Sequence, residues 1–387
     1  MNVLYFDNNA TTRPAPEVLE ALLPYFTERF GNPSSLHGLG VEAAHAVASA
    51  RAAVARLLGA RGPTRIVFTS GGTESNQTAI RAALRLARPR KRVVTTAAEH
   101  SAVLEPLASE ERDGAEVVRV AVDSQGRLEL ASLLDAIDER CALASVMWAN
   151  NETGVVNDLA PIAARCREAG ALLHVDAVQA CGKLPMDVSA LGLDLVSVSA
   201  HKLHGPKGVG ALYVRPGLEL EPLLRGGPQE NERRGGTENV PGIVGFGRAA
   251  QLAQAWLASD GPAQLARRRD ALETRLCAEL PGTIVHAREV ARVPNTSNVR
   301  FDDISGEAVV TLAADEGLCL STGAACSSSR HRPSHVLLAM GLDAAQASSS
   351  VRFSLSRTTT DAEVERALAI TASCVTRLRA LQSSART

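Results

Sequence analysis

The chain has 387 residues, of which 45% are hydrophobic and 21% charged, and its formal net charge is −1. This length allows one large or two ordinary domains with substantial cores. The near-neutral charge gives no electrostatic reason to expect a nucleic acid as partner. The apolar runs are only as long as strands, so no membrane span is expected.

The cysteine pattern points to a reducing compartment. The seven cysteines are odd in number, scattered and never spaced as CxxC, so neither a disulfide framework nor a structural zinc site is expected. A metal site from Cys319, Cys326, His331 and His335 would match no standard zinc spacing. The N-terminus also lacks the pattern of a secretory signal. These features predict a cytoplasmic protein without a metal site of its own.

Lysine is rare in this chain. Only four of the 41 basic residues are lysines, namely Lys91, Lys183, Lys202 and Lys207. Arginine cannot replace lysine in a Schiff base, because its guanidinium does not lose its proton. Any chemistry that needs a lysine amine therefore has four candidates.

Short β-rich runs alternate with segments of helical period from about residue 64 onward. The predicted strands cover residues 65–69, 92–96, 116–122, 143–148, 171–175, 193–198 and 209–214. The predicted helices between them cover residues 73–87, 101–112, 128–139 and 158–169. This alternation predicts an α/β fold with a mostly parallel, seven-stranded sheet. The turn at 204–208 is too short for a crossover, so the last strand should be antiparallel and the sheet mixed.

The pattern changes after Pro241. One long helix is predicted over residues 245–279, followed by an irregular α+β segment. We expect a large domain over residues 16–259 and a smaller C-terminal α+β domain over 260–387. Residues 1–15 are expected to pack with the smaller domain.

Polar groups follow the predicted strands, at the edge where open α/β sheets bind ligands. After residues 65–69, Gly71, Gly72 and Thr73 form a turn with Thr73 as the expected helix N-cap. This turn is either an ordinary capped joint or an anion cradle made of backbone N–H groups.

Asp176 ends an otherwise apolar strand, where a carboxylate is costly to bury without a partner. It either caps a helix or keeps a heteroaromatic ring nitrogen protonated, as pyridoxal phosphate requires. Gln179 follows closely and could reach the same ligand. Lys202, beside Ser199 and His201, is the preferred Schiff-base amine.

The residues that follow two further predicted strands each have two possible roles. His100 either neighbours a helix cap or stacks on a planar cofactor and moves protons. Asn150 and Asn151 either form a turn or offer an amide to the cofactor and substrate.

Two residues of the C-terminal part complete the set. Cys326 lies in a run of Gly, Ala and Ser, which favours an exposed, nucleophilic thiol over a buried structural one. Arg352 lies on a predicted strand and suits bidentate binding of a carboxylate, although a surface salt bridge is the alternative.

Taken together, these residues resemble the pyridoxal-phosphate cysteine desulfurases of the nitrogen-fixation and iron–sulfur-cluster type, the NifS/IscS group, which belongs to the class-V aminotransferases. The nitrogen-fixation branch is the more similar one. Ten motifs match in order, at residues 5–12, 30–35, 69–76, 99–100, 150–154, 174–179, 199–208, 233–239, 323–327 and 352–357.

The resemblance implies a fold-type-I transferase that forms a homodimer and uses pyridoxal 5'-phosphate. Lys202 would bind the cofactor covalently and move a substrate proton, and Cys326 would be the nucleophile. Asp176 would pair with the ring nitrogen, Gln179 with the ring hydroxyl, and His100 would stack on the ring. The remaining cofactor contacts would come from Gly72, Thr73, Asn151, Ser199, His201 and, from the neighbouring subunit, Thr237.

The implied reaction converts L-cysteine to L-alanine and leaves a persulfide on Cys326 for a sulfur acceptor such as an iron–sulfur scaffold protein. Asn151 and Arg352 would hold the substrate carboxylate. A selenocysteine lyase, an aminotransferase on the same scaffold and a non-enzymatic sulfur-relay protein are the alternatives. The resemblance also leaves open that the protein binds metal through an iron–sulfur cluster.

Overall fold

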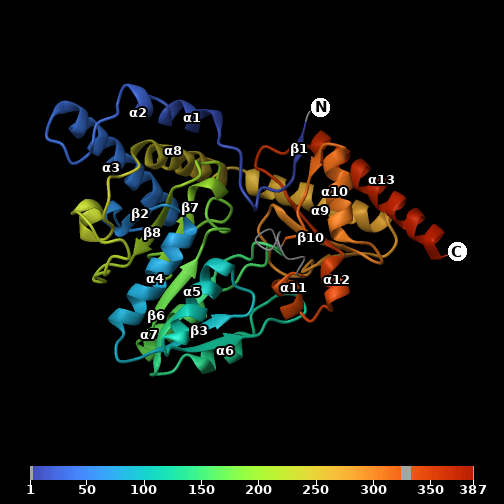
Figure 1. Cartoon of the computed structure of the whole chain (residues 1–387), viewed down its shortest axis with the longest axis horizontal. Helices are drawn as coiled ribbons and strands as arrows, with labels where there is room; N and C mark the ends of the chain where they lie inside the picture. Colours follow the sequence, from blue (N-terminus) through green and yellow to red (C-terminus); the bar gives the residue numbers. More distant parts are fainter. Residues whose placement is uncertain (1–2, 324–332, 387) are drawn as a thin grey trace.

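The computed structural model describes residues 3–323 and 333–386. Its main sheet has seven strands in the order β2-β8-β7-β6-β5-β3-β4 (Figure 1). The strand bounds are β2 (Ile66–Thr69), β3 (Arg92–Thr96), β4 (Glu116–Val120), β5 (Cys141–Met147), β6 (Leu172–Asp176), β7 (Leu195–Ser199) and β8 (Gly210–Val214). The mixed, mostly parallel seven-stranded sheet is therefore confirmed.

The direction of each strand follows from its connection. β3, β4, β5, β6 and β7 pair in parallel with their neighbours in that group. β8 runs antiparallel to both β7 and β2, which confirms the expectation from the short turn at 204–208. All residues of β5, β7 and β8 are buried, as expected for strands covered on both faces.

Helices cover both faces of the sheet, and alternate residues of a strand divide between two cores. Ile66 and Phe68 belong to one apolar cluster and Val67 to another, because successive side chains of a strand point to opposite faces. Helices α4 (Gly72–Leu86) and α5 (Ser101–Arg112) pack in the second cluster. The first contains residues of α1 (Pro16–Leu22), α3 (Gly38–Leu58), α6 (Leu130–Ala136), α7 (Ala160–Ala169) and α8 (Val240–Leu257).

The C-terminal part has its own antiparallel sheet, in the order β12-β10-β9. Its elements are α9 (Gly261–Glu279), β9 (Thr283–His286), β10 (Thr296–Phe301), α10 (Gly306–Asp315), β11 (Leu318–Cys319), α11 (His335–Ala339), α12 (Ala344–Ser348), β12 (Ser350–Ser354) and α13 (Asp361–Arg386). Near the N-terminus, β1 (Leu4–Tyr5) pairs with β11, and Leu4 and Phe6 enter the apolar cluster of this part. The domain boundary at residue 260 stays a prediction.

The remaining elements are short. They are α2 (Pro24–Thr27) and the 3₁₀ turns Pro63–Arg65, Ala200–Lys202 and Gln229–Glu232. The 3₁₀ turn after β7 carries Lys202.

The prediction of one helix over residues 245–279 is wrong. The segment forms two helices, α8 and α9, separated by residues 258–260. Pro262 lies in the first turn of α9, where a missing backbone N–H costs nothing, whereas inside a continuous helix its ring would clash with the preceding turn. Similarly, Pro241 lies in the first turn of α8. This helix begins at Val240, five residues before the predicted start.

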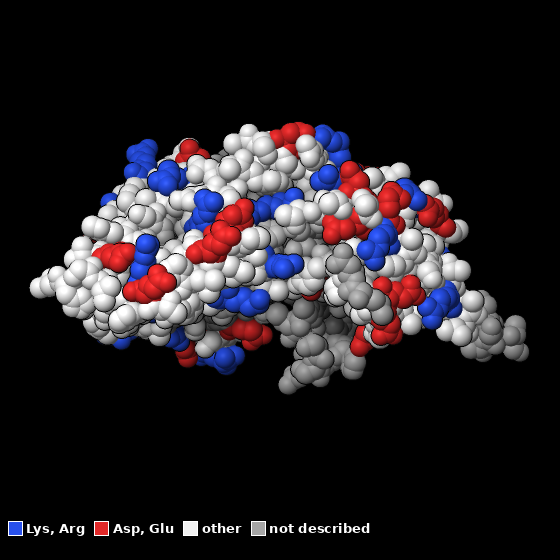
Figure 2. Space-filling model, turned by 90° about the horizontal axis from the view of Figure 1, so that it is seen from above, with Lys and Arg blue, Asp and Glu red and all other residues white. Residues whose placement is uncertain are grey.

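Basic and acidic side chains are interspersed on the face shown in Figure 2, without a large field of one sign. In the described part of the chain, no helix combines the length and the apolar character needed to cross a membrane.

Candidate functional site

One cavity of about 310 Å³ lies where β2, β3, β5, β6 and β7 end. Every predicted site residue except Thr237 and Cys326 lines it. The cavity is also lined by residues that were not singled out, namely Asn9, Ala10, Asn76, Ala102, Met147, Ala149, Val178 and Gly323. The cavity therefore brings together nine predicted residues from the carboxyl edge of the main sheet and Arg352 from β12 of the C-terminal sheet.

The turn before α4 opens into this cavity through Gly72 and Thr73. The N-cap of α4 is Gly71, and no side chain caps the first turn, so the expectation that Thr73 is the N-cap is wrong. A Cβ on Gly72 would come within 2.8 Å of Val178 Cγ2, and glycine therefore permits this close packing. The uncapped helix N-terminus offers N–H groups and a positive dipole end to an anion.

Asp176 is nearly buried at the end of β6, and two donors hold its carboxylate. Its Oδ2 accepts from Asn76 Nδ2 (2.7 Å), and its Oδ1 accepts from the backbone N–H of Val178 (3.0 Å). Sequence reasoning required a partner for Asp176 but missed Asn76. The signal was its position four residues after Gly72, on the same face of α4.

His100 is both a helix cap and a cavity residue. Its Nδ1 accepts from the backbone N–H of Ala102 (3.0 Å) at the start of α5, so the neutral ring carries its proton on Nε2. Burial lowers the pKa of His100, an effect that Asp176 opposes and the charge of Lys202 adds to. The structure thus confirms the position at the helix cap, while stacking on a planar cofactor stays a prediction for the same side chain.

Lys202 directs its amine toward the N-terminal segment. Its Nζ donates to the main-chain oxygens of Asn9 (2.5 Å) and Ala10 (2.8 Å). Lys91 and Lys207 are exposed, whereas Lys183 is 7% exposed. Among the lysines, Lys202 alone lines this cavity.

Arg352 is buried, so its alternative as a surface salt bridge is wrong. Its Nη2 pairs with Asp7 Oδ1 (2.6 Å), and its Nη1 donates to the main-chain oxygen of Asn151 (3.0 Å). Its buried Nε has no hydrogen-bond partner among the described residues. An arginine held in this way at a cavity suits the binding of a carboxylate.

The two asparagines after β5 differ in role. Asn150 Oδ1 accepts from the backbone N–H groups of Glu152 and Thr153, which is turn chemistry. Asn151 lines the cavity. Of the two alternatives for this pair, the structure shows the turn at Asn150, and ligand binding by Asn151 stays a prediction.

Two predicted residues are not placed in this cavity. Thr237 lines a separate cavity of about 210 Å³ with Ser70 and Arg234. Cys326 lies outside the described residues, although Gly323, three positions earlier, lines the cavity. Among the described residues, no group of three or more His, Cys, Asp or Glu side chains could hold a metal ion.

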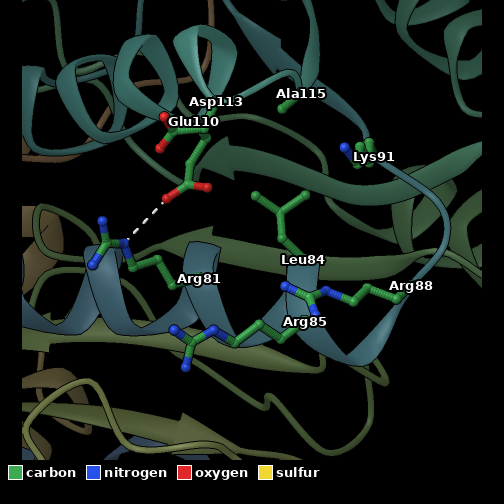
Figure 3. Close-up of a pocket in the computed structure, with 8 residues that line it drawn as sticks. All are labelled: Arg81, Leu84, Arg85, Arg88, Lys91, Glu110, Asp113 and Ala115. Carbon is green, nitrogen blue, oxygen red and sulfur yellow. Dashed lines mark hydrogen bonds and ion pairs between the residues drawn. The ribbon is translucent and has the colours of Figure 1, made fainter.

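A second cavity, of about 330 Å³, lies between the last turns of α4 and α5 (Figure 3). Arg81 pairs there with Glu110, and Arg85 pairs with Glu221. Basic side chains in the last turn of a helix also compensate its negative dipole end. The charges of Arg81 and Arg85 are therefore compensated by carboxylates without a ligand.

Glu99 is a buried carboxyl beside His100. Its Oε1 accepts from the backbone N–H of Met147 (2.9 Å) and from Thr96 Oγ1 (2.9 Å). Burial raises the pKa of Glu99 to about 8, and the charge of Asp176 adds to this effect. Folding therefore favours the protonated carboxyl, so its contribution to stability is complete below about pH 4.5 and is lost as the pH rises through about 8.

We predict that Glu99→Gln, a neutral mimic, flattens the pH dependence of stability in the apoprotein. The free energy of unfolding of the unsubstituted protein should fall relative to the variant by about 1 kcal/mol per pH unit between about pH 5 and 8. Urea denaturation at several pH values measures this difference. Glu105→Gln, at an exposed position of α5, is the control, and parallel profiles for Glu99→Gln would contradict the prediction.

Comparison with known proteins gives consistent matches over the whole chain. The model of the class-V aminotransferase family matches residues 4–367. A cysteine desulfurase of Cereibacter sphaeroides is 50% identical over 383 residues, which cover 98% of each chain.

Solved structures agree with this match. One described as a NifS-like protein has a TM-score of 0.90 and 37% identity, covering 97% of this chain and 100% of its own. A structure of SspA in complex with cysteine has a TM-score of 0.81 and 34% identity, covering 92% and 99% of the two chains. The chain therefore belongs to the class-V aminotransferase family and, within it, to the cysteine desulfurases.

Proposed function

We propose that this cysteine desulfurase uses pyridoxal 5'-phosphate to convert L-cysteine to L-alanine and retains the sulfur as a persulfide on Cys326. The observation that carries the proposal is the convergence of Lys202, Asp176 and His100 on one cavity. A binding protein that only relayed sulfur would need none of these three side chains. The structure of SspA was determined in complex with cysteine, which supports the choice of substrate.

The cavity has the groups that this cofactor requires. The N-terminus of α4 at Gly72 and Thr73, with Ser199 and His201, would bind the phosphate. The pKa of His201 is lowered to about 4, mainly by burial, so its ring would be a neutral hydrogen-bonding group at pH 7. We assign Thr237 to the phosphate site of the neighbouring subunit.

The ring of the cofactor would be held by three other residues. Asp176 would pair with the ring nitrogen, since its carboxylate is already fixed by two donors. His100 would stack on the ring, and Gln179 would contact the ring oxygen. Lys202 would attach the cofactor through its amine.

The substrate carboxylate would bind Arg352 and Asn151, which both line the cavity. When bound, pyridoxal phosphate withdraws electrons from the substrate Cα, which makes the Cα proton acidic and the sulfur electrophilic. Lys202 would then move this proton at its Nζ, and His100 would hold a proton at its Nε2.

Cys326 would attack the substrate sulfur as a thiolate. The bond between the substrate sulfur and its Cβ breaks, and a sulfur–sulfur bond to Cys326 forms. L-Cysteine and one thiol thus give L-alanine and one persulfide, without an external oxidant or reductant. Further turnover requires the sulfur to leave, so we propose an acceptor protein such as an iron–sulfur scaffold.

A cytoplasmic location fits this chemistry. Among the described residues, all six cysteines are free thiols, as expected where disulfides are kept reduced.

We predict that Lys202→Ala loses both the covalently attached cofactor and the formation of alanine from cysteine, because no other lysine lines the cavity. Reduction with borohydride followed by mass spectrometry locates the attachment site. Lys91→Ala, at an exposed position, should retain both. An unchanged borohydride-trapped adduct in Lys202→Ala would assign the role to another lysine.

We predict that Cys326→Ala keeps the yellow cofactor but forms no alanine and no sulfide from cysteine. The measurement is alanine release, together with mapping of the persulfide on the unsubstituted protein. Cys277→Ala removes a thiol of the C-terminal part and should retain full activity. Retained activity in Cys326→Ala, or a persulfide on another cysteine, would refute the proposed role.

We also propose that the protein is a homodimer joined through its N-terminal helices. Large apolar side chains are exposed over residues 19–41, at α1, α2 and the start of α3, which lie together at one corner in Figure 1. They are Leu19, Leu23, Phe26, Phe30, Leu36, Leu39 and Val41. A concentration of apolar surface of this kind is typical of a protein–protein interface.

We predict that the double variant Leu23→Asp/Phe26→Asp has half the mass of the unsubstituted protein in light scattering, because two charges would have to be buried in the interface. Leu86→Asp is the matched control, since it places a charge at an exposed leucine at the end of α4. An unchanged mass for the double variant would exclude this surface as the interface.

A further inference from the structure

Lys183 is a second lysine close to the site, and its side chain is almost fully buried. Its Nζ donates to Gln179 Oε1 (2.6 Å) and to Asn9 Oδ1 (2.9 Å). Because a buried amine without hydrogen bonds would be costly, these two contacts explain how Lys183 is tolerated there. They also connect Lys183 to two residues that line the cavity.

The carboxamide of Asn9 has one orientation that satisfies its neighbours. Its Nδ2 donates to the main-chain oxygen of Asn151 (3.1 Å) and to Thr296 Oγ1 (2.8 Å). Its Oδ1 accepts from Asn295 Nδ2 (3.0 Å) as well as from Lys183. Exchange of O and N would place an N–H group against two donors, so an oxygen must face Lys183.

The carboxamide of Gln179 is oriented in the same way. Its Nε2 donates to the main-chain oxygen of Asn9 (3.0 Å), which can only accept, and its Oε1 is bonded to Lys183. Gln179 Nε2 has a second N–H. With the oxygen occupied by Lys183, this N–H is the group that Gln179 can offer to a ligand in the cavity.

The charge state of Lys183 suits this arrangement. Burial lowers the pKa of Lys183 well below its ordinary value, the charges of Lys202 and Arg352 lower it further, and Cys181 opposes the shift. Even a neutral amine has two N–H groups, one for each of the two carboxamide oxygens. Lys183 can therefore donate both hydrogen bonds without a buried positive charge.

We propose that Lys183 is a positioning residue that holds the carboxamide of Gln179 with its N–H toward the cavity, so that Gln179 donates to an anionic oxygen on the cofactor ring. This inference rests on the proposed binding of pyridoxal phosphate. Lys183 does not line the cavity, and it acts only through Gln179 and Asn9. Without it, the hydrogen bond from Nε2 to the main-chain oxygen of Asn9 is the only one among the described residues that holds the Gln179 carboxamide in this orientation.

The test is Lys183→Met, which keeps a long apolar stem but has no donor. The midpoint of the pH titration of the cofactor's visible absorption should rise by about one unit, the size expected for the loss of one hydrogen bond to the ring oxygen. Lys91→Met, the same change at an exposed lysine, should leave the midpoint unchanged. In a Gln179→Ala background, Lys183→Met should cause no further shift.

An unshifted midpoint in Lys183→Met, or an equal shift in the Gln179→Ala background, would overturn the inference. If Lys183→Met does not fold, Lys183→Ala replaces it. Its shorter side chain leaves room beside a small cavity of about 30 Å³ that Lys183 also lines. A midpoint that does not rise in Lys183→Ala would equally overturn the inference. If the unsubstituted protein binds no cofactor, the proposed function itself is wrong. If it binds the cofactor but the midpoint does not shift in the Lys183 variants, only the role of Lys183 is wrong.

Discussion

The hydrogen bonds of Asn9 join the N-terminal segment to residues of the main domain and of the C-terminal sheet around the site. Its main-chain oxygen accepts from Lys202 and Gln179, and its side chain contacts Lys183 and the neighbouring β10 residue Thr296. Its backbone N–H donates to the side chain of Ser354 in β12. Residues that follow the strands of the main sheet line the cavity together with Arg352 of the C-terminal sheet, so one buried residue contacts both parts of the chain. The geometry of the site depends on this connection.

The site requires many polar groups to be buried, and the loss of their hydration is unfavourable. Asp176, Arg352, Lys183 and Glu99 all lie near the cavity and are almost inaccessible to water. Each has hydrogen bonds that offset its desolvation, and Arg352 is also ion-paired with Asp7. Asp176 and Arg352 also line the cavity, where a ligand could contact them. The same contacts that stabilise these groups thus also orient them for chemistry.

Much of the fold and the site could be predicted from local patterns. Strand-sized apolar runs and the short turn at 204–208 indicated the sheet and the direction of its last strand, and polar residues after the strands indicated the site. The misses were of two kinds. Pro262 was a visible break in the predicted helix, and it was not used. The pairing of Asn76 with Asp176 had only a weak signal, the position of Asn76 on the same helix face as Gly72, because a hydrogen bond across 100 residues leaves no local pattern that names the partner.

The sequence by itself determined which chemical groups the chain offers at recognisable motifs: an amine, a carboxylate, an imidazole and a thiol. It also determined the order of strands and helices, since periodicity and turns are local properties. Only the tertiary structure decided that Arg352 is buried against Asp7 and that Lys183 faces two carboxamide oxygens. Burial and pairing arise from packing between distant segments, and they set the charge state and direction of each group.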